Sequence, residues 1–389
     1  MIGKSTLSPH GRGIRGERRD RWRWRGRIGL LGVALAFCLY PVLPNEDVIN
    51  SDWPAFATGA AMIVDDPGQL YDLHAQARFQ NHVTGGRHLV TLGIQGILPF
   101  LAPAWVALLA VPFELLGTDI GGRLWILFGL ACLGAGLYLA TRPRPPTAVL
   151  PAFASVPTAL MMLNAQLDGV VALGLGAAIA LWSRPYLAGL ALGLTLMKPQ
   201  LVLPLGFALL LARRWKVLAG WAAAGVALLA PTLALNQHWV FDWAGQTRST
   251  VQTGAREIDL AHFAVVFPSS LQGPALAVIT LIAIAGVLFL AWRRRGDFQA
   301  AAAIVIAGGV VAAPHALPAD LVVVALAMAL WGQARWYEWL GLTVGALITA
   351  LAAPPVPAIV GVAMVAWVCL RASGLLTSRS PEPVPASAR

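Results

Sequence analysis

Charge is scarce in this chain of 389 residues. Only 12% of the side chains are Asp, Glu, Lys or Arg, whereas a soluble domain has about 25%. Hydrophobic residues make up 58% of the chain, and long apolar runs recur from residue 28 to residue 371. This composition excludes a soluble globule and predicts an all-α, polytopic integral membrane protein.

Cysteines and recognisable catalytic motifs are also few. The three cysteines, Cys38, Cys132 and Cys369, lie far apart within apolar runs. They therefore predict small buried side chains, with no disulfide or zinc site. A Ser-His-Asp order, a glycine-rich phosphate loop and a metal-binding motif are all missing from the sequence. We expect no metal ion and no cofactor.

Positive charge exceeds negative charge by ten, but its placement is not that of a nucleic-acid-binding protein. Six arginines lie between residues 18 and 27, and short basic clusters separate the later apolar runs. This is the distribution of basic residues on the cytoplasmic side of a membrane protein. We expect residues 1–27 to form a disordered basic cytoplasmic tail, 28–372 the membrane domain and 373–389 a disordered tail.

The polar stretch 44–95 separates the first apolar run from the second. If the basic tail is cytoplasmic, this loop faces outside, which in a bacterium is the periplasmic face of the inner membrane. Residues 54–64 and 72–83 are predicted to form short helices at the membrane surface. Asp52 precedes the first of them, where it could cap the helix or act as a general base. Glu46 and Asp47 are rival candidates for the base.

Two topologies stay open for the middle of the chain. Simple alternation of spans places Arg142, Arg144 and Arg184 outside, against the distribution of the other basic residues. Alternatively, one segment before Arg142 is re-entrant and the run 187–211 breaks at Pro199. Those arginines then lie inside, and the polar residues 164–168 and 198 lie at the outer face. The second topology agrees better with the charge distribution.

Lys198 is the clearest ionisable residue within an apolar run. Such a residue is costly in a membrane and marks a functional site by default. Pro199 breaks the helix beside it, which is tolerable only next to protein or water. The ammonium group could bind an anionic headgroup such as a phosphate. It could equally extend to the interface or pair with Asp168.

Two further polar breaks interrupt the apolar runs. Pro314-His315-Ala316-Leu317-Pro318-Ala319-Asp320 ends at a carboxylate that could cap the next helix. His315 has no such structural role and could donate to a phosphate oxygen. Asn164-Ala165-Gln166-Leu167-Asp168 offers amides suited to sugar hydroxyls, although a plain helix–helix turn explains it equally well.

Four of these features, in this order, resemble the pattern of glycosyltransferase family 87. The first is Ser51-Asp52-Trp53-Pro54 followed by Gly68-Gln69-Leu70-Tyr71-Asp72 in the outer loop. The others are Asn164-Ala165-Gln166, Met197-Lys198-Pro199-Gln200 and Pro314-His315 with Asp320. The family pattern has a glycine where this chain has Ala165. The resemblance covers residues 28–372.

The resemblance implies a GT-C fold, with about 10–13 membrane helices and a catalytic loop on the outer face. Such enzymes move one sugar, typically mannose, from a polyprenyl-phosphate carrier to an acceptor hydroxyl, with inversion at the anomeric carbon. The family's general base corresponds to Asp52, and Lys198, His315 or Arg87 could stabilise the phosphate leaving group. The predicted substrate-binding residues are Trp53, Tyr71, Arg87, Asn164, Gln166, Asp168, Lys198, His315 and Asp320.

Two other functions stay open. Broken helices and a buried lysine also fit a secondary transporter or a lipid or glycan flippase, although no pair of matching halves is visible. The chain could also be an inactive structural subunit of an envelope-polysaccharide complex. As an enzyme, its expected partners are the lipid-linked sugar, a glycan or lipid acceptor and membrane lipids, with no nucleic acid.

Overall fold

The computed structural model describes residues 48–89, 96–249, 258, 261–264 and 267–376. The basic tail, the first apolar run with Cys38, the rival carboxylates Glu46 and Asp47, and most of the C-terminal tail lie outside these residues. The described parts of the chain are helical and contain no strand. The prediction of an all-α protein is therefore confirmed for them.

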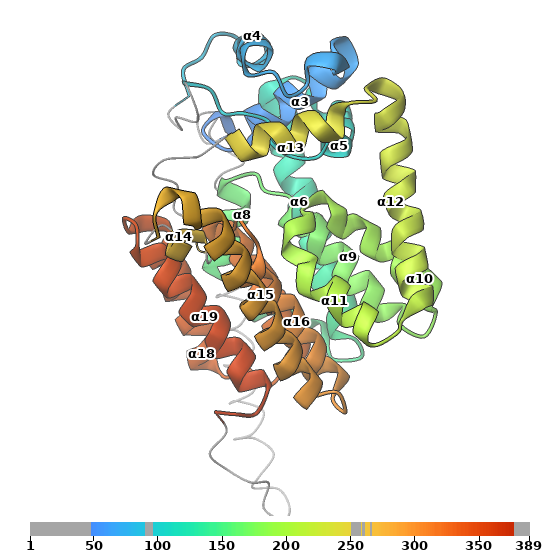
Figure 1. The fold of residues 1–389 in the computed structure, drawn as a ribbon, viewed down its shortest axis with the longest axis vertical. Coiled ribbons are helices and arrows are strands. Elements are labelled where there is room, and N and C mark those ends of the chain that lie inside the picture. Colours follow the sequence, from blue (N-terminus) through green and yellow to red (C-terminus); the bar gives the residue numbers. More distant parts are fainter. Residues whose placement is uncertain (1–47, 90–95, 250–257, 259–260, 265–266, 377–389) are drawn as a thin grey trace, which may run out of the picture.

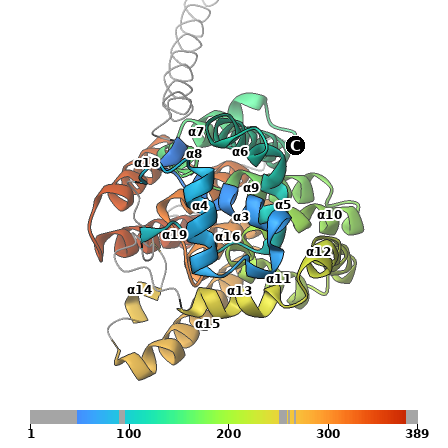
Figure 2. The same cartoon turned by 90° about the horizontal axis from the view of Figure 1, so that it is seen from above.

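Four helices form a layer at one end of the molecule, which we call the cap (Figure 1). They are α3 (Trp53–Asp65), α4 (Leu73–Val83), α5 (Ala104–Glu114) and α13 (Trp239–Ser249). Seen from above, α3 and α4 lie over the middle of the helices below (Figure 2). The two helices expected in the first loop are thus present as α3 and α4, with the turn at Pro67–Gln69 between them, and α3 is largely buried.

The remaining helices form a bundle beneath the cap (Figure 1). Its first half contains α6 (Thr118–Thr141), α7 (Leu150–Phe153), α8 (Val156–Leu163), α9 (Asp168–Ala180), α10 (Pro185–Leu192), α11 (Leu203–Leu211) and α12 (Trp215–Leu235). Its second half contains α14 (Ala261–Ala264), α15 (Ser269–Arg293), α16 (Phe298–Ala312), α17 (Leu321–Trp331), α18 (Trp336–Leu351) and α19 (Val356–Ala372).

Three helices of the bundle are long and apolar enough to cross a membrane, namely α6, α12 and α15. The segments Pro146–Phe153 and Val156–Leu163 add a fourth span if their 65° bend lies within one crossing. Most of the other bundle helices are apolar but shorter. The apolar helices are those of a membrane protein, and several of them end inside the bundle.

Aromatic and amide side chains join the cap to the bundle. The Trp53 indole nitrogen donates to the carbonyl oxygen of Thr118 at 2.8 Å, at the start of α6. The α13 residue Trp243 donates likewise to the carbonyl of Leu101 at 2.7 Å, and Asn236 to that of Pro67 at 3.0 Å. The later polar stretch that begins at residue 236 therefore returns to the same end as the first loop.

Basic side chains gather at the opposite end of the bundle. Arg214 lies over the ring of Trp182, 5.6 Å from its centroid, and the Trp182 ring is 4.9 Å from that of Phe298 at the start of α16. Arg144 donates to the carbonyl of Leu330 at 2.8 Å. Together with Arg371, which pairs with Glu338 at 2.7 Å, these contacts define what we call the basic end.

These contacts support the second of the two topologies. α5 lies in the cap (Figure 1), so the segment before α6 turns back without reaching the basic end. The run 185–211 starts beside Trp182, breaks between Gly193–Met197 and Pro199–Val202, and returns to Arg214. The middle arginines therefore lie with the other basic residues, and Lys198 lies at the apex of a helical hairpin.

Candidate active site

Three turns of the bundle meet beneath the cap at a buried ion cluster. Asp168 starts α9, Lys198 separates the two 3₁₀ turns of the α10–α11 hairpin, and Asp320 ends the turn Pro318–Asp320 before α17. The Lys198 ammonium is 2.9 Å from an Asp168 oxygen and 2.6 Å from an Asp320 oxygen. Its side chain is 12% exposed, and those of Asp168 and Asp320 are 0% and 3% exposed.

The ion cluster decides between the alternatives for two residues. Lys198 pairs with Asp168, as one interpretation expected, and also with Asp320. Asp320 additionally accepts the backbone N–H of Leu317 at 2.7 Å, so it closes its own turn and binds the lysine, but its side chain does not cap α17 as expected. A phosphate could reach the ammonium group directly only by sharing it with these two carboxylates.

Asp52 joins the cluster from the cap side. It precedes α3, yet its side chain makes no capping hydrogen bond, so the expectation that it caps the helix is wrong. The Gln166 side-chain nitrogen donates to Asp52 Oδ2 instead. The Asp52 backbone N–H donates to the carbonyl of Asn164 at 3.2 Å. By contrast, Asp72 does cap α4, accepting from the backbone N–H of Ala75 at 2.7 Å.

The half-buried Asp52 carboxyl has an unusual acidity. Burial raises its pKa to about 6, against an ordinary value of 3.8. The positive charge of Lys198, the hydrogen bond from Gln166 and the nearby His315 oppose the rise, while Asp320 adds to it. A carboxylate with a pKa just below neutral is ionised at pH 7 and is still basic enough to accept a proton.

His315 lies on the same turn as Asp320, between α16 and α17. Its side chain is half-buried, and it is near enough to Asp52 to affect the acidity of that carboxyl. The backbone N–H of Ile258 donates to the next carbonyl, that of Ala316, at 2.9 Å. The chain is thus fixed directly after His315, which belongs to the same site as Asp52, Lys198 and Asp320.

The turn 164–166 holds an unusual backbone conformation. Ala165 has φ +50°, in the left-handed region where glycine is favoured, and it occupies the position where the family pattern has glycine. The indole nitrogen of Trp125 donates to the Ala165 carbonyl at 2.9 Å. Sequence analysis missed this role of Trp125, because a buried indole N–H usually finds a hydrogen-bond partner but no local pattern indicates which one.

Four predicted substrate-binding residues have other roles in this structure. Trp53 is 0% exposed and anchors α3 to α6. Tyr71 is 5% exposed and donates its hydroxyl to the carbonyl of Ala102 at 2.9 Å, so neither ring offers a free face to a sugar. Arg87 pairs at the surface with Asp119 at 3.0 Å. The Asn164 side chain donates to Leu160 within its own turn at 2.9 Å.

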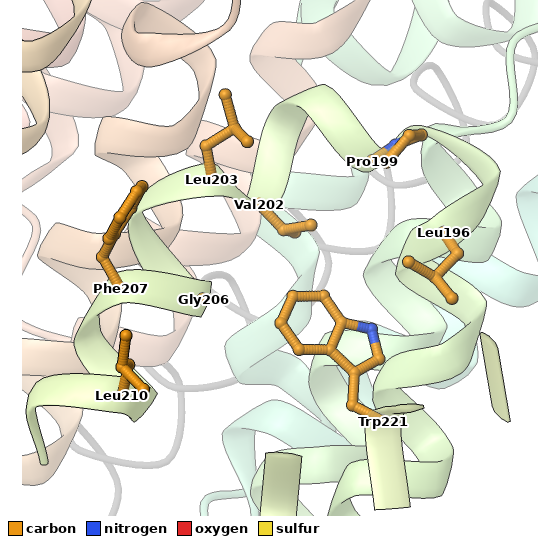
Figure 3. Close-up of a pocket in the computed structure, with 8 residues that line it drawn as sticks. All are labelled: Leu196, Pro199, Val202, Leu203, Gly206, Phe207, Leu210 and Trp221. Atoms are coloured by element: carbon orange, nitrogen blue, oxygen red, sulfur yellow. The ribbon is translucent and has the colours of Figure 1, made fainter. Parts of the chain in front are cut away.

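An apolar groove of about 340 Å³ flanks the break at Lys198 (Figure 3). The α10–α11 hairpin lines most of it, and the Trp221 indole of α12 closes one side (Figure 3). Several lining side chains are exposed on the outside of the bundle, among them Phe207 and Leu210. The lining residues are Leu196, Pro199, Val202, Leu203, Gly206, Phe207, Leu210 and Trp221.

Comparison with known proteins assigns a family. A sequence model described as Glycosyltransferase family 87 matches residues 100–318, which is more than half of the chain. The matched range includes the turn 164–168, Lys198 and His315. Asp52 precedes the range, and Asp320 follows it by two residues. No curated protein and no solved structure matches the chain significantly.

Proposed function

Because the chain belongs to glycosyltransferase family 87, we propose that it moves one sugar, mannose, from a polyprenyl-phosphate carrier to an acceptor hydroxyl at the outer face of the membrane. The family establishes that the chain is a glycosyltransferase, so the transporter, flippase and inactive-subunit alternatives lose their support. The observation that carries the proposal is the meeting of Asp52 with three polar helix breaks beneath the cap.

Asp52 is the proposed general base. Its carboxylate accepts the proton of the acceptor hydroxyl while the hydroxyl oxygen attacks the anomeric carbon of the sugar. The bond from that carbon to the phosphate oxygen breaks in the same displacement, and polyprenyl phosphate leaves with the bonding electrons. One displacement inverts the anomeric carbon. The acidity of Asp52 supports the role, because the group is mostly ionised at pH 7.

The other side of the site suits a phosphate leaving group. His315 is the proposed donor to the phosphate, since its half-buried imidazole lies close enough to Asp52 to affect the acidity of that carboxyl. Lys198, held between Asp168 and Asp320, contributes its charge from a fixed position. We propose no metal ion in this chemistry, so transfer should survive treatment with a chelator.

The apolar groove supports a donor that is carried on a lipid. It starts at Leu196 and Pro199, on either side of Lys198, and continues along α11 toward the basic end (Figure 3). An isoprenoid chain lying along it would keep the sugar phosphate at the depth of Lys198 and His315. Water-soluble nucleotide sugars have no part that would occupy such a surface.

The decisive experiment compares two aspartate-to-asparagine variants of the purified full-length protein. Transfer of labelled mannose from polyprenyl-phosphate-mannose to lipid or glycan acceptors is measured in detergent. Asp52→Asn keeps the size of the side chain and one acceptor oxygen but cannot accept the proton. We expect it to lower kcat by about 10²–10⁴-fold.

Asp72→Asn is the matched control, because asparagine caps a helix as well as aspartate does and Asp72 serves α4 as a cap. It should keep wild-type transfer. Equal rates in the two variants would remove Asp52 as the base. Failure of the wild type with every polyprenyl-phosphate sugar would remove the proposed donor class.

A further inference from the structure

Gln166 has a side chain that the chemistry proposed above does not use. It is 8% exposed and lies at the start of α9, 114 positions after Asp52. Its amide nitrogen faces Asp52 Oδ2. An ionised carboxylate can only accept hydrogen bonds, so the donor nitrogen facing it favours the ionised state of Asp52 over the protonated one.

The turn that carries Gln166 is fixed from several directions. Trp125 holds the carbonyl of Ala165, and Asp168, two residues after Gln166, is tied to Lys198. The carbonyl of Asn164 receives the backbone N–H of Asp52 itself. The turn therefore binds Asp52 through two hydrogen bonds, one from the Asp52 backbone nitrogen and one to a carboxylate oxygen. Gln166, on a turn fixed by these contacts, is suited to orienting the Asp52 carboxylate. It has little freedom to adjust to a bound sugar.

These two hydrogen bonds leave one oxygen of the Asp52 carboxylate available to a substrate. With Oδ2 engaged by Gln166 and the backbone fixed by Asn164, rotation about the Asp52 side chain is restricted, and Oδ1 is the oxygen left for the acceptor hydroxyl. Proton transfer requires the base within about 2.6–3.2 Å of the hydroxyl oxygen, so this restriction matters for the rate. The other charged groups that face Asp52 are Lys198, His315 and Asp320.

We propose that Gln166 is a positioning residue, which orients the Asp52 carboxylate toward the acceptor hydroxyl and favours its ionised form. The assignment rests on the proposed role of Asp52 as general base. It replaces the sequence-based hypothesis that the Gln166 amide binds a sugar hydroxyl. Gln166 acts through Asp52 and touches no reacting atom.

The test uses three glutamine variants of the full-length protein in detergent. Gln166→Ala removes the donor. Gln166→Glu keeps the shape but places a second carboxyl against Asp52, so the two groups share a proton. Gln80→Ala is the matched control, because Gln80 is also buried and its amide binds only backbone groups of Leu98 in the cap. Its substitution can lower the stability of the protein, but it removes no hydrogen bond to the Asp52 carboxyl.

Two readouts are needed, and only one depends on turnover. The first is infrared titration of the Asp52 carboxyl, identified as the band that Asp52→Asn removes. Gln166→Ala should move its midpoint up by about one pH unit, since one hydrogen bond to a charged group is lost. Gln166→Glu should move it further up. Gln80→Ala should leave it at the wild-type pH.

The second readout is the kinetics of mannose transfer. Gln166→Ala should lower kcat by about 10- to 100-fold, and the KM for donor and acceptor should change by less than about threefold. An unchanged Asp52 midpoint in both Gln166 variants would overturn the proposal even if wild-type transfer is robust. A raised acceptor KM with unchanged kcat would also overturn it, because Gln166 would then contact substrate. If the midpoint moves but the wild type transfers no sugar, the proposed function fails and the positioning of Asp52 by Gln166 stands.

Discussion

The acidity of Asp52 sets a pH limit on the reaction. Its carboxyl must be ionised to accept a proton, and its pKa is raised to about 6, chiefly by burial. Below that pH the protonated form dominates, so kcat/KM should fall about tenfold for each further pH unit. Above pH 7 the rate should be level with respect to this group. Initial rates at saturating donor across this range measure the midpoint, and a midpoint near 4 would mean that Asp52 is an ordinary solvated carboxylate.

The same acidity predicts the effect of Asp52 on stability. A carboxyl whose pKa is higher in the folded protein than in the unfolded chain favours folding when it is protonated. That benefit is present below its unfolded value of 3.8 and is lost as the pH rises through about 6. At pH 7 the inactive Asp52→Asn variant should therefore unfold at the same temperature as the wild type or at a higher one. A clearly lower melting temperature would assign Asp52 a structural role.

Sequence reasoning named the ionisable residues that the structure brings together, but of their contacts only the pairing of Lys198 with Asp168. A lysine within an apolar run is conspicuous because burying its charge in a membrane costs free energy. Lys198 lies at the helix break beside Pro199. Trp53 and Tyr71 were expected to hold a sugar, yet both are buried, because an aromatic residue beside a carboxylate has the same pattern whether it faces a ligand or the core. The bond between Gln166 and Asp52 joins residues 114 positions apart, and no local pattern predicts such a pair.

Glycines between α6 and α9 set the position of the turn that carries Gln166. A Cβ atom at Gly136 would lie 2.4 Å from the carbonyl oxygen of Ala172, and one at Gly169 would lie 2.0 Å from that of Gly129. The two backbones are therefore in direct contact, which is how small residues pack helices in membranes. α9 begins at Asp168, so the separation of α6 and α9 also fixes the ion cluster.

Two alanine variants of α6 test this packing. Gly136→Ala should push α9 away and lower the free energy of unfolding by about 1–3 kcal/mol, with reduced transfer because Asp168 moves relative to Lys198. Gly134→Ala should be neutral or slightly stabilising, because its Cβ would meet only the Phe153 ring at an ordinary 3.5 Å. Melting temperatures and transfer rates of both variants check the prediction. Equal losses in the two would show that helix contact at Gly136 does not matter.

At the level of elements, the sequence predicted the two helices of the first loop and the break near Pro199 well. Proline beside a polar residue disfavours a continuous helix, so these features are local. The sequence leaves two topologies open for the middle segments, because α5 has the length and hydropathy of a short membrane span. In the structure α5 lies in the cap (Figure 1). The tertiary contacts of α5, such as Trp105 against Trp239 of α13 at 5.3 Å, show that it belongs to the cap.

The whole molecule has two chemically different ends, the cap with the site beneath it and the basic end. Basic residues favour the cytoplasmic side, so we propose that the cap faces outside. Single cysteines in an otherwise cysteine-free chain test this. Gln69→Cys, exposed beside α4, should react with a membrane-impermeant maleimide in intact cells. Arg295→Cys, exposed between α15 and α16, should react only after the membrane is permeabilised, and the reverse pattern would place the active site in the cytoplasm.

The ion cluster also dictates an order of assembly during synthesis. The ribosome makes Asp52, Gln166 and Asp168 before Lys198, but Asp320 follows Lys198 by 122 positions. While those positions are translated, the lysine at the apex of the α10–α11 hairpin has only one of its two carboxylate partners. The nascent chain therefore holds Lys198 with Asp168 but without the second carboxylate until α17 is inserted, and a ribosome that stalls before α17 leaves a product without a finished site.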